Sequence, residues 1–259
     1  MNKAVVTLAG GSYLPGAAVQ AMELKSIGCD WKHILFTVPG DEVSKAYRRL
    51  FLDLDVEIRE VTGYLGHPWT AKRNAIQSLK NTDVMFLDAD NILTIDPEII
   101  RLDPKYQETG SVFWRDFGTM PADHILYSLC GVEPREEIEQ EAGQLLINTE
   151  RCASALSALA TLDLRWEEIY PHVRGDKDMW RMAWIKTGTP WIWGSQEIGI
   201  ILDDLGHGRA IIQKWGQRDA CHHRVHCKFS LTGDNWWRSG IPNSLRWFEH
   251  LEVIRSKVL

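Results

Sequence analysis

Asp83-Val84-Met85-Phe86-Leu87-Asp88-Ala89-Asp90-Asn91 is the stretch that decides the predicted fold. Its apolar run is typical of a strand that is covered on both faces of a parallel sheet. Asp88 and Asp90 follow directly, where the strands of open α/β sheets end and ligands bind. Neighbouring carboxylates repel each other unless a cation or a proton relieves the charge. Hard cations such as Mg²⁺ and Mn²⁺ prefer such oxygens, so we expect a metal–phosphate site here, with a solvated acidic turn as the alternative.

The sequence before this stretch alternates between strand and helix patterns. Short apolar runs predict strands at residues 4–9, 33–38 and 56–61. Helical spacing predicts helices at residues 13–27, 41–52 (with Asp41 as the cap) and 68–79. Such alternation predicts an α/β fold with a mixed, mostly parallel sheet and helices on both faces.

The pattern is less regular after residue 91. We expect strands at 111–114 and 144–147, a helix from a Thr149 cap to about residue 162, and another helix at 177–185. The acidic run Glu133–Glu141 predicts a solvated helix or loop, with a lid as the weaker alternative. Residues 190–243 predict loops with short strands. Four apolar residues share one face of a predicted closing helix: Trp247, Leu251, Ile254 and Val258.

Composition limits the class of protein. The 259 residues are 44% hydrophobic and show no linker-like segment, which predicts one domain over 1–259. Within it, we assign 1–90 to nucleotide binding and 91–259 to the acceptor and sugar. A net charge of −6 without a basic cluster argues against nucleic acid as a partner. No apolar run reaches the ~20 residues of a transmembrane helix. Five scattered cysteines favour a reducing compartment, so we expect a cytoplasmic protein. The sequence does not indicate an oligomeric state.

Two compositional features have alternative readings. The chain has twelve tryptophans, whose flat apolar faces can stack on sugar rings. We expect most of these side chains to lie in the core instead. Cys221 and Cys227 lie among three histidines, but their spacing matches none of the paired patterns of structural zinc sites.

Several motifs resemble known families in the order in which they occur. Val6-Thr7-Leu8-Ala9 with Tyr13, and Leu35 to Pro39, resemble the opening of the glycogenin-like glycosyltransferases of the GT-A fold. Phe86 to Asp90 resembles their metal-binding D-x-D motif. Three further motifs are similar to those of fungal-type α-mannosyltransferases: Phe113-Trp114-Arg115-Asp116, Glu141-Ala142-Gly143-Gln144 and Gly175-Asp176-Lys177-Asp178.

The resemblance implies a GT-A, Rossmann-like nucleotide-diphospho-sugar transferase and a role for each matched residue. Asp88, Asp90 and His226 would bind Mn²⁺ or Mg²⁺, with His222 or His223 as alternatives to His226. The donor would contact Thr7, Leu8, Tyr13, Lys72, Ala89, Gly143, Lys177 and Lys228. Catalytic and positioning roles would fall to Asp116, Glu141, Gln144, Asp176 and Asp178. At one position the sequence differs from the family pattern: the family has an acidic residue followed by Gln, and this sequence has Asp176 followed by Lys177.

These inferences predict a metal-dependent glycosyltransferase. It would move a hexose or related sugar from a UDP- or GDP-sugar to a hydroxyl of a glycan or glycolipid, with retained anomeric configuration as the resemblance implies. A sugar-phosphate nucleotidyltransferase is one alternative, although the turn after the first strand, Ala9 to Leu14, lacks a basic residue to grip a triphosphate. A non-catalytic carbohydrate-binding protein is the other.

Overall fold

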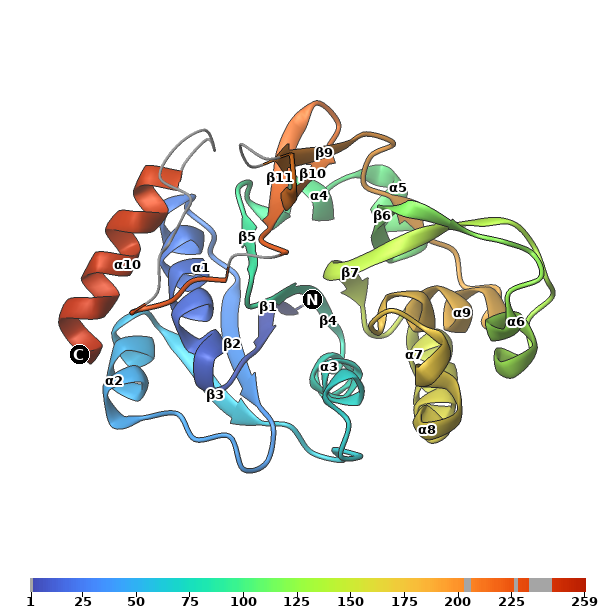
Figure 1. Ribbon diagram of the computed structural model, residues 1–259, viewed down its shortest axis with the longest axis horizontal. Helices are drawn as coiled ribbons and strands as arrows, with labels where there is room; N and C mark the ends of the chain where they lie inside the picture. The colour runs from blue at the N-terminus through green and yellow to red at the C-terminus, as the bar shows by residue number, and fades with distance from the viewer. Residues whose placement is uncertain (1, 203–205, 226–227, 233–243) are drawn as a thin grey trace.

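A seven-stranded sheet forms the centre of the computed structural model (Figure 1), which describes residues 2–202, 206–225, 228–232 and 244–259. Its strand order is β3-β2-β1-β4-β7-β6-β8. The strands are β1 (Asn2–Leu8), β2 (Lys32–Thr37), β3 (Val56–Glu60), β4 (Thr82–Asp88), β6 (Ser111–Met120), β7 (Glu137–Asn148) and β8 (Ile192–Trp193). β1 to β4 pair in parallel, and β7 pairs antiparallel with both β4 and β6. The mixed, mostly parallel α/β sheet predicted from the sequence is confirmed.

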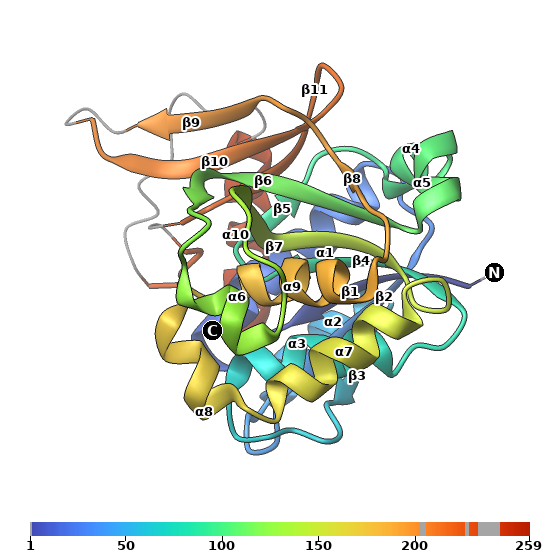
Figure 2. The same cartoon turned by 90° about the vertical axis from the view of Figure 1, so that its right-hand side faces the viewer.

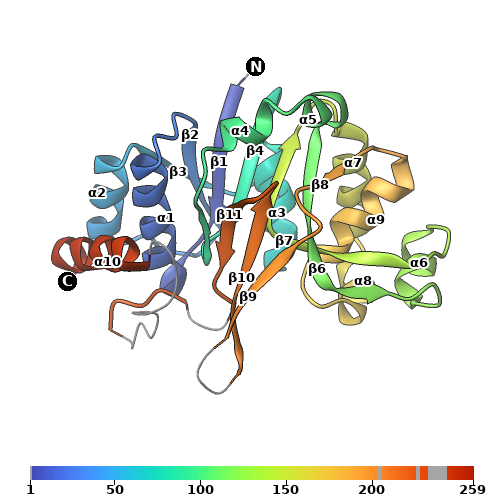
Figure 3. The ribbon, with the colours of Figure 1, turned by 90° about the horizontal axis from the view of Figure 1, so that it is seen from above.

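A second, four-stranded sheet begins immediately after β4. It has the order β5-β11-β10-β9 and consists of β5 (Asn91–Leu93), β9 (Ile198–Leu202), β10 (Gly208–Trp215) and β11 (Arg218–His223). Figures 2 and 3 show this sheet crossing the molecule on the side away from α7 and α8. Residues 89 and 90 are therefore the turn that joins the two sheets.

Helices cover both faces of the large sheet. One face packs on α1 (Leu14–Ser26) and α2 (Lys45–Asp53), and α10 (Ser244–Val258) packs on these two helices from outside. The other face is covered by α3 (Pro68–Gln77), α6 (Ile125–Cys130), α7 (Ala153–Asp163), α8 (Trp166–Ile169) and α9 (Lys177–Thr187). The remaining short helices are η1 (Gly11–Tyr13), α4 (Pro97–Arg101), α5 (Pro104–Thr109) and η2 (Tyr170–His172). Of the helices in the described part of the chain, none has the length and apolar character needed to cross a membrane.

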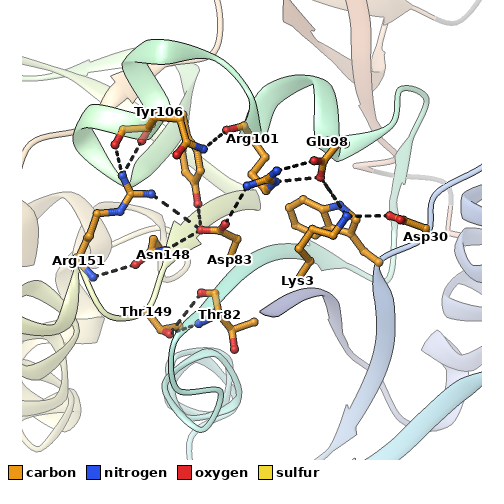
Figure 4. A network of polar contacts seen from close by, with 12 residues as sticks. Lys3, Asp30, Thr82, Asp83, Glu98, Arg101, Tyr106, Asn148, Thr149 and Arg151 are labelled. Carbon is orange, nitrogen blue, oxygen red and sulfur yellow. Dashed lines mark hydrogen bonds and ion pairs between the residues drawn. The ribbon is translucent and has the colours of Figure 1, made fainter. Parts of the chain in front are cut away.

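The amino end of β4 is fixed by a buried polar network (Figure 4). The Asp83 carboxylate accepts hydrogen bonds from Tyr106 Oη at 2.6 Å and Asn148 Nδ2 at 2.7 Å. The guanidinium groups of Arg101 and Arg151 lie 3.8 and 3.9 Å away. Since Asp83 is completely buried, these partners compensate for its lost hydration. β4 is thereby anchored at the end opposite to Asp88.

Three expected element boundaries were wrong. Ser44, not Asp41, caps α2, by accepting a hydrogen bond from the backbone N–H of Tyr47. Thr149 does not cap α7, because its hydroxyl donates to the carbonyl of Leu79 and it is buried beside β4. The acidic run, expected as helix or loop, is a strand from Glu137 onward, because β7 begins there. β7 pairs with β6, which is also longer than the strand expected at 111–114.

The predicted closing helix is confirmed as α10. Trp247, Leu251 and Ile254 are buried against α1 and α2, and Val258 packs beside them. The division at residue 90 into nucleotide and acceptor halves stays a prediction.

Candidate functional site

The turn after β4 lies in the wall of a cavity of about 680 Å³. Among the residues named from the sequence, those that line this cavity are Leu8, Tyr13, Lys72, Asp88, Ala89, Asp90, Asp176 and Lys228. They come from β1, η1, α3, the β4–β5 turn, the start of α9 and the segment after β11. The structure therefore gathers residues that are spread over more than 200 positions of the sequence around one cavity.

Helix α1 clamps the metal-motif turn from behind. A Cβ on Gly16 would lie 2.2 Å from the carbonyl oxygen of Ala89, so only glycine allows this approach. One helical turn later, Gln20 Nε2 donates to the carbonyl oxygens of Asn91 at 2.7 Å and Asp88 at 3.2 Å. Gln20 is completely buried, and the sequence analysis did not single it out. Sequence alone gives no signal for it, because its partners are backbone carbonyls of a distant turn.

The structure does not place Thr7, which was predicted to contact the donor, in the cavity wall. Successive side chains of a strand point to opposite faces, and Thr7 faces α1 while Leu8 faces the cavity. The Thr7 hydroxyl is completely buried, donates to Gln20 Oε1 and lies 3.2 Å from His33 Nε2. Thr7 thus belongs to the support behind the turn, together with Gln20 and His33.

Lys72 is the buried cation of the site. Its Nζ donates to Asp88 Oδ2 at 3.1 Å, Asp176 Oδ1 at 3.2 Å and the carbonyl oxygen of Ala142 at 3.0 Å. Burial disfavours the charge on Lys72, but Asp176 and Asp88 outweigh it and raise the pKa of Lys72 above its ordinary value. Burial also raises the pKa of Asp88 to about 7, with Lys72 opposing the rise. Lys72 therefore stays protonated and holds two carboxylates in place.

Asp90 has a different set of neighbours. Lys228 Nζ lies 3.3 Å from Asp90 Oδ2 and donates to Tyr13 Oη at 2.8 Å. Lys228 is 44% exposed, so this ammonium group is accessible to an anionic ligand. His223 Nε2, at the end of β11, lies 3.7 Å from Asp90 Oδ1. Lys228, which was predicted to contact the donor, therefore lies beside Asp90 in the cavity wall.

Glu141 supports His223 from the side away from Asp90. Glu141 Oε2 lies 3.4 Å from His223 Nδ1, and Glu141 Oε1 accepts from the backbone N–H of Gly143 at 2.7 Å. Burial opposes a proton on His223, but Glu141 and Asp90 outweigh it and raise the pKa of His223 to about 9. Carboxylates placed in this way commonly orient metal-binding imidazoles.

The donor atoms at this site match the chemistry of a hard divalent cation. Asp88, Asp90 and His223 offer two carboxylates and one imidazole, a set used for Mn²⁺. Within the described residues, no three acidic, His or Cys side chains already converge as a complete metal site. Lys72 pairs with Asp88 Oδ2 and Lys228 with Asp90 Oδ2. His226, the histidine named first from the sequence, lies outside the described residues.

The other predicted residues lie around the cavity rather than in its wall. Lys177 Nζ pairs with Asp116 and with Glu139 Oε2, and Asp178 Oδ1 accepts from Arg181 at 3.0 Å. Lys177 is therefore held by Asp116 and Glu139, and Asp178 by Arg181, and Lys177 does not line the cavity.

Gly143 and Gln144 lie on β7 beside the metal motif. A Cβ on Gly143 would lie 2.5 Å from Asn91 Nδ2, so β7 and the β4–β5 turn pack closely at this glycine. Gln144 is opposite Leu87 in the sheet register and is completely buried, with neither amide atom hydrogen-bonded. The structure does not place either residue in the cavity wall.

Part of the cavity wall was missed by the sequence analysis. These additional lining residues are Ala9, Gly10, Val38, Asp41, Tyr64, Pro68 and Trp69. They lie in the loops after β1, β2 and β3 and in the first turn of α3, near the carboxyl ends of parallel strands, and that position was the one signal available for them.

Comparisons with solved structures identify the fold. The structure is similar to the galactosyltransferase LgtC in complex with donor and acceptor sugar analogues (TM-score 0.64, 14% identity), and the match covers 96% of this chain and 95% of LgtC. It is similar to the glycosyltransferase GlyE of Streptococcus pneumoniae TIGR4 (TM-score 0.57, 16% identity), with 99% of this chain covered and 62% of GlyE. It is also similar to core-mannan synthase A from Aspergillus fumigatus in its Mn/GDP form (TM-score 0.52, 8% identity), over 74% and 72% of the two chains.

Sequence comparison adds a narrower likeness. A family described as "Mannosyltransferase putative" matches residues 69–138, which is less than half of the chain. None of the curated proteins matches the chain. The predicted GT-A fold is confirmed, and the family match together with the fold supports a glycosyltransferase.

The Gln20 clamp predicts a stability loss in Gln20→Leu. The substitution leaves the buried carbonyl oxygens of Asp88 and Asn91 without this donor, which costs about 1–3 kcal/mol. Urea unfolding measures the change in the free energy of unfolding. Gln217→Leu, the same substitution at an exposed turn, is the control and should change that free energy by less than about 0.5 kcal/mol. Equal losses in both variants would contradict the clamp.

His33 predicts a pH dependence of stability. Burial lowers the pKa of His33 to about 4 in the folded chain, against about 6.5 when unfolded. The unfolded chain therefore binds the extra proton between these values, and stability falls by about 3 kcal/mol as pH drops from about 6.5 to 4. In His33→Gln this contribution is absent, so the unfolding free energies of variant and wild type should converge at low pH. A constant difference between pH 7 and 4.5 in urea titrations would contradict the assignment.

Proposed function

We propose that this chain is a metal-dependent glycosyltransferase that moves a hexose or related sugar from a UDP- or GDP-sugar to a hydroxyl of a glycan or glycolipid. The observation that carries the proposal is the pair Asp88 and Asp90 in the cavity wall, with Lys72 behind it and the accessible Lys228 in front. Opposite charges are thereby arranged where a cation and a diphosphate would meet.

Asp88, Asp90 and His223 would hold Mn²⁺ or Mg²⁺. Bound there, the cation would neutralise the negative charge that develops on a nucleoside diphosphate leaving group. Lys228 is placed to bind the same diphosphate directly, because its ammonium group is accessible and lies beside Asp90. Tyr13 accounts for one of its hydrogen bonds and keeps it over the cavity.

The environment of Asp176 supports retention without a covalent intermediate. Asp176 Oδ2 accepts from Trp180 Nε1 at 2.9 Å, and Lys72 pairs with the same carboxylate. A carboxylate engaged in this way is a poor nucleophile. The acceptor hydroxyl would instead attack on the face that the leaving phosphate vacates. The hydroxyl oxygen would form a bond to the anomeric carbon while the bond between that carbon and the phosphate oxygen breaks. The leaving phosphate oxygen would take the proton of the acceptor hydroxyl.

Loss of either metal-motif carboxylate should abolish the reaction. Asp88→Asn and Asp90→Asn remove a negative charge with little change in shape, so we expect at least a ~100-fold loss of Mn²⁺-dependent hydrolysis of UDP- and GDP-sugars. The readout is the release of nucleoside diphosphate, followed alongside the thermal unfolding midpoint. Asp53→Asn, on the surface of α2, should retain full activity. Unchanged turnover in both metal-motif variants would end this proposal.

The three neighbouring histidines should behave differently. His223→Ala should weaken Mn²⁺ binding about 10- to 100-fold, in the range that metal-site substitutions produce. His222 packs edge-on against Trp247 at 5.4 Å, so His222→Ala should lower stability and leave metal affinity unchanged. Calorimetric titration of Mn²⁺ in the presence of UDP or GDP measures both affinities. A loss of metal binding in His226→Ala but not in His223→Ala would return the role to His226.

A further inference from the structure

Four aromatic side chains meet beside the cavity and form a surface that we call the aromatic platform: His67, Trp69, Trp166 and Tyr170. The ring centroid of His67 lies 4.7 Å from that of Trp69 and 4.9 Å from that of Trp166. Tyr170 lies 4.9 Å from His67 and 5.1 Å from Trp69. Trp69 lines the cavity, whereas the other three rings lie outside its wall. The platform therefore begins in the cavity and continues out of it.

Buried polar contacts hold the platform from behind. Tyr170 is buried, and its hydroxyl donates to Asp163 Oδ1 at 2.5 Å. Asp163 Oδ2 accepts from Arg73 Nε at 2.8 Å, and Arg73 belongs to α3, the helix that carries Trp69. His67 Nδ1 accepts from the backbone N–H of Trp69 at 3.3 Å, which fixes the imidazole at the start of α3. The rings are thus positioned in advance, and a ligand that packs on them would immobilise little that is free.

The two tryptophans of the platform differ from the buried tryptophans in the use of the indole N–H. Four buried indoles donate a hydrogen bond within the protein: Trp31, Trp114, Trp180 and Trp184. Trp69 and Trp166 are only partly buried, and in the part of the chain that the structure describes neither indole N–H donates to another group. Each therefore presents an apolar face together with an unused donor, the combination that suits a ligand with both apolar and hydroxyl groups.

Trp69 connects the platform to the centre of the site. Trp69 and Lys72 are three positions apart on α3, so they share one face of the helix. Lys72 pairs there with Asp176 and with the metal motif. Burial lowers the pKa of His67 below its ordinary value, with Asp163 and Asp176 opposing the change, so the imidazole is neutral near pH 7. The platform is consequently an uncharged surface that leads away from the charged part of the cavity.

We propose that the aromatic platform binds the acceptor, and that this acceptor is an oligosaccharide of at least two sugar units rather than a single sugar. A pyranose has a face of C–H groups, which packs on an aromatic ring, and a rim of hydroxyl groups, which forms hydrogen bonds. The unit that receives the transferred sugar would lie at Trp69, inside the cavity. The following units would cross His67 and Trp166 outside it. A nucleobase also stacks on indole rings, but it is the last group of the donor and would not continue across the outer rings.

The inference rests on the proposed function, and affinity as a function of acceptor length tests it separately. Calorimetry in the presence of Mn²⁺ and UDP or GDP would compare mono-, di- and trisaccharides of mannose and of galactose. Wild type should bind the trisaccharide of one series about 3- to 10-fold more tightly than the monosaccharide, the effect of an added stacking contact. In Trp166→Ala this gain with length should disappear. In Trp166→Phe, which keeps an aromatic face, most of the gain should return.

Trp193→Ala is the matched control, because Trp193 is also a partly buried tryptophan packed on the same hydrophobic core, but it lies on β8, an end strand of the large sheet. It should keep the gain with length. An equal loss of affinity for all lengths in Trp166→Ala would make the platform merely structural and overturn the inference, as would the absence of a gain in wild type for both series. A loss of UDP or GDP affinity in Trp166→Ala would place the donor on the platform and overturn it as well. Failure of wild type to release nucleoside diphosphate from any UDP- or GDP-sugar with Mn²⁺ would instead contradict the proposed function.

Discussion

The site depends on the buried ion pairs of Lys72. A single ammonium group joins Asp88 at the end of β4, Asp176 at the start of α9 and the carbonyl oxygen of Ala142 on β7. A charge buried to this extent is tolerated only when it is fully paired, so each partner fixes the positions of the others. Lys72 therefore fixes the relative positions of β4, β7 and the start of α9, and it also supplies the buried positive charge of the cavity.

Two supports hold the metal-motif turn between the sheets. From α1, the missing side chain of Gly16 and the amide of Gln20 fix the carbonyl groups of the turn. On the other side, His223 of β11 approaches Asp90, and Glu141 of β7 supports His223. The backbone and the side chains of the turn are therefore fixed by different elements.

Residues that are neighbours in the sequence act separately in the structure. Asp176 and Lys177 stand where the glycogenin-like enzymes have an acidic residue followed by Gln, and the sequence suggested that both face the donor. Adjacent residues at the start of a helix point about 100° apart. Asp176 consequently faces Lys72, whereas Lys177 faces Asp116 and Glu139 on the β6–β7 pair. Lys177 therefore belongs to an ion-pair cluster beside the cavity, while Asp176 lines the cavity itself.

The sequence by itself determined the order of strands and helices up to Asp88, the open α/β class, and the place of Asp88 and Asp90 at the end of a strand. These follow from local periodicity and from the rule that ligands bind where parallel strands end, which need only neighbouring residues. Only the tertiary structure decided that Thr7 faces α1 and that His223 and Glu141 meet beside Asp90. It also decided that Trp166 meets His67 beside the cavity. Each of these contacts joins residues far apart in the chain, and their distance is set by sheet register and helix packing, which no local pattern specifies.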